Sequence, residues 1–255
     1  VVPIVAPYVG QVLAMQFSWR APLLLLSLYG ITIAAWVLVR LPETSPGPES
    51  FRWTRIVRTS VEILRTRQSA GYIIAGGAMY GTLFAFIFSG QQVLGEHFAL
   101  QRQFPLAFGG LAVCAVLTSL LNSILVGRLG MRLISHAAVI AFLIAATAMW
   151  TLHAMDMLGL AAFLVLAACC MALLSLIFAN FNALAMEPWS QHAGAASSLL
   201  GAGTTLIASG LGHAIGQAYD GSAGPLAGGF IICAVAALVA VLVTERWQLF
   251  GVKAD

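Results

Sequence analysis

The chain has 255 residues, of which 60% are hydrophobic and 8% are charged, and its net charge is +3. A soluble domain usually has about 25% charged residues, so this composition excludes an ordinary water-soluble globule. The few basic residues are divided among loops, which indicates membrane orientation and excludes a nucleic-acid-binding surface. The sequence therefore predicts an all-α polytopic membrane protein.

All charged residues lie outside eight long apolar stretches. A membrane-spanning helix needs about 17 or more consecutive apolar residues, and every stretch meets this limit. The chain therefore predicts eight transmembrane helices. The stretches are residues 1–19, 21–39, 68–95, 103–127, 133–155, 157–186, 188–219 and 221–244.

The basic residues predict the orientation, because cytoplasmic loops are enriched in Lys and Arg. With the residue 1 side and the C-terminus in the cytoplasm, ten basic residues fall inside, and only Arg20 and Arg102 fall outside. The ten are Arg40, Arg52, Arg55, Arg58, Arg65, Arg67, Arg128, Arg132, Arg246 and Lys253.

The first stretch contains Pro3, Pro7 and Gly10, which predict a kinked helix that packs closely on a neighbour. An ordinary kink and a functionally shaped helix are both consistent with this spacing. The stretch opens without an initiator methionine or a basic flank, so we expect the chain to be truncated at its N-terminus.

Residues 41–68 form the longest polar segment, and they predict a cytoplasmic linker between residues 1–40 and a six-helix unit at 69–255. Prolines and a glycine at 41–48 prevent a helix. Residues 51–67 then carry apolar side chains at helical spacing and arginines on the other faces, which predicts a helix lying on the inner leaflet. Anchoring and partner binding are the two interpretations of that helix.

Several motifs along the chain agree in order and spacing. They are Pro3 to Gly10, Trp19-Arg20 before the second helix, Leu41-Pro-Glu-Thr44 after it, residues 122–132 (NSILVGRLGMR), and residues 193–198 (AGAASS). Together they resemble the major facilitator superfamily, and specifically its bicyclomycin-resistance type (Bcr/CflA) of drug:proton antiporters. Ala6 and Gln11 depart from the family pattern, which puts the tightest helix contact there in doubt.

The resemblance implies that the eight helices are helices five to twelve of a twelve-helix fold built from two halves. It also implies a monomer in a bacterial inner membrane that exports drug-like small molecules, uses the proton as coupling ion, and needs no cofactor or metal. In the family an acidic residue of the first helix carries the proton. The chain alone, which has no carboxylate within its apolar stretches, is predicted not to couple.

Arg128, Gly130 and Arg132 lie in the motif at 122–132, at the cytoplasmic end of two successive helices. The resemblance implies a gating loop that helps to hold one conformational state. Simple anchoring by positive charge is the alternative, because either role places arginines there.

Two helices carry candidate cavity residues. Tyr80, Phe84, Phe88 and Gln91 share one helical face, and the resemblance places this face on the seventh helix, toward the cavity. Ser175, Phe178 and Asn182 share a face of the tenth helix. Aromatic rings beside an amide suit lipophilic or cationic compounds. The alternatives are lipid-facing or packing aromatics, and interhelical hydrogen bonding for Asn180 and Asn182.

His213 lies deepest in its stretch among the histidines and is a candidate for proton relay or substrate contact. A neutral histidine that hydrogen-bonds a neighbouring helix is the alternative. The other histidines lie near stretch ends or in loops. Glycines cluster at 76–81 and at 201–216, and each cluster includes a Gly-x-x-x-Gly, which predicts close helix packing with sliding as a further possibility.

Other classes of protein fit these residues less well. A carrier that takes up another small metabolite, such as a sugar or an organic anion, is one alternative, but an anion site usually has Arg or Lys in the cavity, and none lies within the stretches. A membrane enzyme would need clustered His, Asp or Glu at one membrane face, and Glu187 and His192 alone share a loop. A non-catalytic membrane scaffold is the remaining alternative.

Overall fold

The structure is a computed structural model that describes residues 9–10, 12–42, 53–101 and 103–250. Seven helices in these ranges are long and apolar enough to cross a membrane. They match the second to eighth predicted stretches and confirm an all-α polytopic membrane fold. They are α2 (Ala21–Arg40), α4 (Arg67–Gln92), α5 (Phe104–Leu129), α6 (Met131–Ala154), α7 (Leu160–Met186), α8 (Ala193–Gln217) and α9 (Gly224–Thr244).

The first predicted stretch is described only in part. Pro3 and Pro7, which predict its kink, lie outside the described residues, and Gly10 lies in a short helical segment. An alanine methyl at Gly10 would meet no described atom within 4 Å. The predicted close packing at Gly10 therefore stays a prediction.

Local sequence explains where the helices begin and end. Pro22, Pro105 and Pro225 each lie in the first turn of a helix, where proline's missing N–H costs nothing. Gly130 separates α5 from α6 with a φ of +78°, a left-handed value that favours glycine. Two short irregular helices, η1 (Val93–His97) and η2 (Glu187–His192), extend α4 and precede α8.

The helix α3 (Trp53–Arg65) occupies the segment for which the sequence predicts an amphipathic helix. It packs against the neighbouring ends of α4 and α8, and Ile63 is buried there. The bundle end that carries α3 is called the linker end below, and the other is the loop end. The position of α3 on the inner leaflet stays a prediction.

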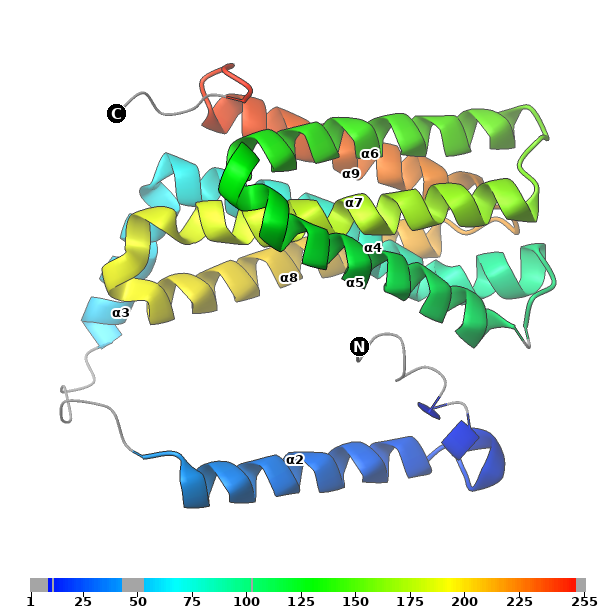
Figure 1. The fold of residues 1–255 in the computed structure, drawn as a ribbon, viewed down its shortest axis with the longest axis horizontal. Helices are drawn as coiled ribbons and strands as arrows, with labels where there is room; N and C mark the ends of the chain where they lie inside the picture. Colours follow the sequence, from blue (N-terminus) through cyan, green and yellow to red (C-terminus); the bar gives the residue numbers. More distant parts are fainter. Residues whose placement is uncertain (1–8, 11, 43–52, 102, 251–255) are drawn as a thin grey trace.

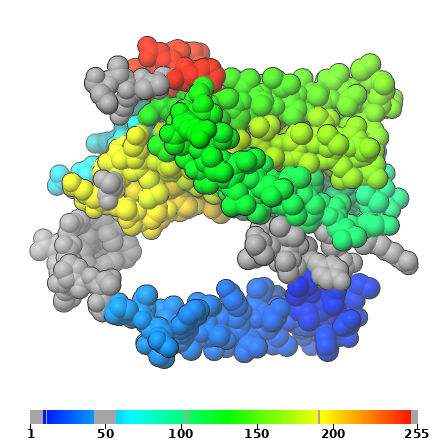
Figure 2. Space-filling view, viewed as in Figure 1, coloured from blue at the N-terminus to red at the C-terminus, as the bar shows by residue number. Residues whose placement is uncertain are grey.

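Six helices, α4 to α9, form one bundle around α4. About two-thirds of the apolar window of α4 is buried, and α4 packs against α7, α8 and α9. The helices α6 and α9 pack on each other on the side of the bundle far from α2 (Figure 1). None of the residues of α2 is buried, and Figure 2 shows open space between α2 and the bundle. The bundle therefore supplies the packed scaffold of any site.

A candidate substrate-binding face and its supports

Four aromatic rings form a continuous row across α4 and α7. Tyr80 stacks on Phe178 with ring centroids 4.8 Å apart, and its edge meets Phe84 at 5.3 Å. The row continues to Phe88, whose ring centroid lies 5.7 Å from that of Phe84. Three of the rings are half-buried, while Phe88 is 46% exposed. Two faces that the sequence identifies separately thus meet and leave their rings accessible.

The polar candidates extend this row at its two ends. Ser175 and Asn182 lie about one turn before and after Phe178 on α7, and both are half-buried. The Ser175 hydroxyl donates to the Ala172 carbonyl at 2.8 Å, so its oxygen can still accept a hydrogen bond. Gln91 is exposed at the end of α4, beyond Phe88. The aromatic row with these three residues is called the aromatic face below.

Two histidines differ in burial from what their positions in the predicted stretches indicate. His213 is exposed on α8, and no hydrogen bond joins it to another described residue. His136, which lies near the start of a predicted stretch, is fully buried. The structure thus does not tie His213 to the aromatic face by any described contact, and its role stays a prediction.

Glycines allow α8 to approach α4 behind the aromatic face. A methyl group at Gly212 would lie 2.4 Å from the Cβ atom of Phe84, and one at Gly216 would lie 3.0 Å from the Cβ atom of Phe88. Side chains of α8 fill the complementary spaces, since Ile207 and Leu211 lie against Gly77 and Gly81. The close packing predicted from the Gly-x-x-x-Gly pairs is confirmed, and it sets the position of Phe84 and Phe88.

A buried amide pair joins α5 to α7. The Nδ2 atom of Asn180 donates to the Oδ1 atom of Asn122 at 2.8 Å and also to the Leu176 carbonyl at 2.8 Å. The interhelical hydrogen bond predicted for Asn180 is therefore present. Such bonds within membranes typically contribute about 0.6 kcal/mol, so this pair aligns the two helices more than it stabilises them.

A cluster of charged and polar residues closes the linker end of the bundle. Arg132, at the start of α6, donates from Nε to Glu245 at 3.1 Å and from a terminal nitrogen to Glu187 at 3.4 Å. Glu245 also accepts a 2.7 Å hydrogen bond from the Tyr72 hydroxyl, which lies 3.1 Å from His136. Three helix ends, from α6, α7 and α9, are thus connected to α4.

Other polar contacts bind the start of α4 to the end of α7. Gln68 donates to the Leu184 carbonyl at 2.8 Å and to Glu187 at 2.6 Å. The buried Ser69 hydroxyl donates to the Ala185 carbonyl at 2.8 Å and accepts from the Trp189 indole at 3.1 Å. Arg132, Glu187, Glu245, Tyr72, His136 and Gln68 together are called the linker-end cluster below.

Arg128 and Arg132 have the same predicted role, but the structure places them in different surroundings. Arg128 is exposed and forms no ion pair within the described ranges, whereas Arg132 is held between two carboxylates of its own six-helix unit. Sequence reasoning missed Glu245, Tyr72 and His136. The predicted topology could have indicated part of this cluster. Successive helices cross the membrane in opposite directions, which places Arg132, Glu187 and Glu245 on one side of the membrane.

The described residues hold no group of three or more His, Cys, Asp or Glu side chains that could bind a metal ion. The four cysteines lie on α5, α7 and α9 and are free thiols, two of them buried. The groups in the described residues that could contact a substrate are thus mainly aromatic rings, amides, hydroxyls and one cluster of charged side chains.

Comparison with known proteins agrees with this architecture. The sequence profile of the Major Facilitator Superfamily matches residues 1–213. A bicyclomycin resistance protein homolog of Haemophilus influenzae is 29% identical over 243 residues, which cover 93% of this chain and 60% of that protein. YdgK of Bacillus subtilis, an uncharacterized transporter of the same superfamily, is 29% identical over 215 residues, 79% of this chain and 51% of its own length.

The chain therefore spans between half and two-thirds of the length of these relatives. The similarity confirms the resemblance to the bicyclomycin-resistance type that the motifs indicate. The match of the superfamily profile covers well over half of the chain. This protein belongs to the major facilitator superfamily of membrane transporters.

Proposed function

We propose that this protein exports lipophilic or cationic drug-like compounds across a bacterial inner membrane, in exchange for protons, by alternating access. The aromatic face is the observation that carries the proposal. Each of its four rings lies within stacking distance of the next and remains partly exposed, so a flat or cationic compound can lie against them.

The polar residues of the aromatic face are uncharged, which supports a substrate that does not need an ion pair with the protein. The described spanning helices carry Asp and Glu only near their ends, at Glu96 and Glu187, and carry Arg only at their ends. A cavity for an organic anion would instead present Arg or Lys. Amides and hydroxyls adapt to varied donors and acceptors, which suits a carrier of diverse compounds.

Similarity supports export of a drug-like compound, and the family resemblance implies that export is coupled to protons. The matched protein of Haemophilus influenzae is named as a homolog of a bicyclomycin resistance protein. Proton exchange needs a group that binds a proton and substrate in turn, and the described spanning helices place no carboxylate at mid-membrane. The proposed proton site therefore lies elsewhere in the transporter, as the family resemblance implies.

Transport by the purified full-length transporter in proteoliposomes tests the proposal. Ethidium is expected to accumulate in the vesicles when the lumen is made acidic, and the accumulation is expected to collapse when a protonophore removes the gradient. Uptake that ignores the gradient would contradict proton exchange. Uptake of a sugar phosphate or carboxylate in place of ethidium would favour the alternative, a carrier for another small metabolite.

Tyr80 lies at the centre of the aromatic face, so its ring should matter more than its hydroxyl. We expect Tyr80→Leu to raise the apparent KM for ethidium about three- to tenfold, because one ring contact contributes about 0.5–1.5 kcal/mol. Tyr80→Phe keeps the ring and should transport nearly as the wild type does. Equal effects of the two substitutions would show that the row does not bind substrate.

A further inference from the structure

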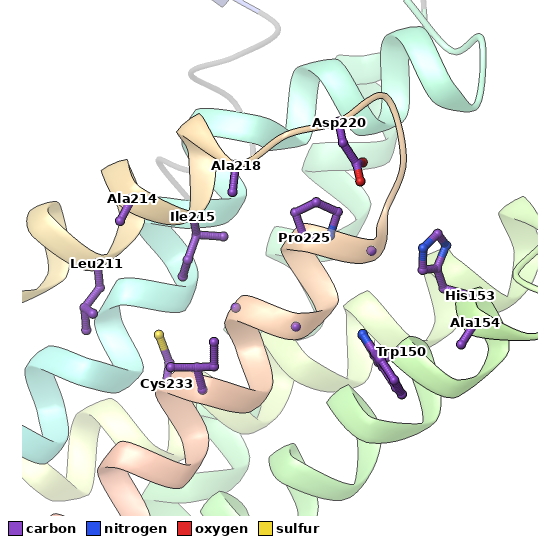
Figure 3. Close-up of a pocket in the computed structure, with 14 residues that line it drawn as sticks. Trp150, His153, Ala154, Leu211, Ala214, Ile215, Ala218, Asp220, Pro225 and Cys233 are labelled. Carbon is purple, nitrogen blue, oxygen red and sulfur yellow. The ribbon is translucent and has the colours of Figure 1, made fainter.

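A groove lies at the loop end between α6, α8 and α9, with a volume of about 680 Å³, which is within the range of about 300–1,000 Å³ usual for ligand sites. Its walls are mainly apolar and include Ile232. Ile215 and Cys233 also lie along it (Figure 3). Ile232 is 65% exposed and Trp150 is 46% exposed, although both belong to membrane-spanning helices. These side chains therefore lie on the outer surface of the six-helix bundle.

Three glycines of α9, Gly224, Gly228 and Gly229, line the groove. A methyl group at Gly229 would lie 2.6 Å from the Ile215 side chain, so α8 and α9 touch there. Nearer the loop end α9 faces α6, and a methyl group at Gly224 would lie 2.4 Å from the Nε2 atom of His153. A methyl group at Gly228 would lie 3.8 Å from the Trp150 indole, and a longer side chain would project into the groove.

The loop end of the groove carries a carboxylate that is oriented and charged. Ser222 donates to the Oδ1 atom of Asp220 from its backbone N–H at 3.0 Å and from its hydroxyl at 2.7 Å. The hydroxyl hydrogen bond is the main reason why the pKa of Asp220 is lowered from its ordinary value. Among the described residues, nothing donates to the second oxygen, Oδ2, so it is available to a ligand.

A hydrogen-bond donor faces the same groove. The Trp150 indole lines it, and its Nε1 atom makes no hydrogen bond to any residue that the structure describes. The groove thus offers an anionic acceptor and a neutral donor beside apolar walls, and the His153 imidazole also lines it. A phospholipid with an ammonium headgroup has the complementary parts, since its ammonium can meet Asp220 and its phosphate or ester oxygens can accept from Trp150.

The charge of the loop end selects among lipids. By sequence, the loops that join α4 to α5, α6 to α7 and α8 to α9 carry Glu96, Asp156 and Asp220 with a single cation, Arg102. This surface repels an anionic headgroup. A primary ammonium is also a compact hydrogen-bond donor, which a choline headgroup is not.

We propose that the groove binds one phospholipid of the ethanolamine type, with its ammonium on Asp220 and an acyl chain along α8 and α9. The site lies apart from the aromatic face and does not depend on drug export. It would make the lipid a bound component of the loop end, where it fills the space that α6, α8 and α9 leave between them.

Native mass spectrometry of the purified protein in detergent tests the site. The protein is titrated with dioleoyl phosphatidylethanolamine, phosphatidylcholine and phosphatidylglycerol, which share their acyl chains. We expect the ethanolamine lipid to bind most tightly. Asp220→Asn keeps the acceptor for Ser222 but removes the charge, and it should weaken binding of this lipid about two- to fivefold, as expected for the loss of an exposed ion pair.

Two matched variants control for charge and for folding. Asp156→Asn removes a carboxylate of the same end that does not line the groove, and asparagine tolerates the positive φ of 56° at this position. It should leave lipid binding unchanged. Gly228→Leu should fill the groove and abolish binding of all three lipids, whereas Gly110→Leu on α5, where no described atom is within 4 Å, should not.

Three results would overturn the proposal. Equal affinity for the three lipids would exclude headgroup recognition, and equal effects of Asp220→Asn and Asp156→Asn would exclude the ion pair. Tetraphenylphosphonium that binds in an Asp220-dependent way, while the ethanolamine lipid does not, would assign the groove to a transported cation. None of these results depends on whether ethidium is exported.

Discussion

Replacing Arg132 with methionine is expected to destabilise the protein by about 2–3 kcal/mol, between the values for exposed and buried ion pairs. The Arg132 and Glu245 side chains are 15% and 17% exposed, so two carboxylates would lose a partly desolvated partner. Methionine keeps the apolar stem of the side chain, which limits the change to the charge. The measurement is the fraction of detergent-solubilised protein that survives heating.

The matched control is Arg128→Met, because Arg128 is exposed at the same bundle end and forms no ion pair with described residues. It removes the same charge and should cost under about 1 kcal/mol. A double variant, Arg132→Met with Glu245→Gln, should regain part of the loss, since a neutral amide can still accept from Tyr72. Equal losses for Arg128→Met and Arg132→Met would contradict the role of the linker-end cluster.

The second large effect is expected at Gly212. An alanine methyl there would lie 2.4 Å from the Phe84 Cβ atom and 2.9 Å from the backbone nitrogen of Ala85. The helix α4 must move away from α8, which costs about 1–3 kcal/mol as overpacking does elsewhere. Because Phe84 lies in the aromatic face, ethidium transport should fall together with thermal stability.

Gly210→Ala is the control, two residues earlier on the same helix. No described atom lies within 4 Å of an alanine methyl at Gly210, so the substitution should be neutral or slightly stabilising through helix propensity. If Gly212→Ala and Gly210→Ala behaved alike, the close approach of α4 and α8 would not be required. The pair separates packing from the general effect of replacing a helical glycine.

Much of the fold follows from the distribution of charges in the sequence. Seven charge-free stretches correspond to helices, because an apolar segment in a membrane must satisfy its backbone hydrogen bonds internally. Helix ends differ by a few residues where proline or glycine intervenes, as at Pro188, after which α8 begins only at Ala193. Orientation and the linker function stay predictions.

The aromatic face could be predicted only in part. Helical spacing puts Tyr80, Phe84 and Phe88 on one side of α4, because residues three or four apart are neighbours on a helix. Which side faces Phe178 depends on how α4 and α7 rotate against each other. The glycines of α8 lie against Phe84 and Phe88 and so constrain the rotation of α4, which makes the meeting of the two faces a property of the packed bundle.

The sequence alone determined the membrane class, the helices, the superfamily resemblance and the residues that line one face of α4. The tertiary structure decided which charges meet and which cavities open. Arg132 pairs with Glu187 and Glu245, which lie 55 and 113 residues later in the sequence, and the groove near Asp220 is lined by residues of three helices. Local periodicity describes a single helix, whereas ion pairs and grooves arise from the relative placement of several.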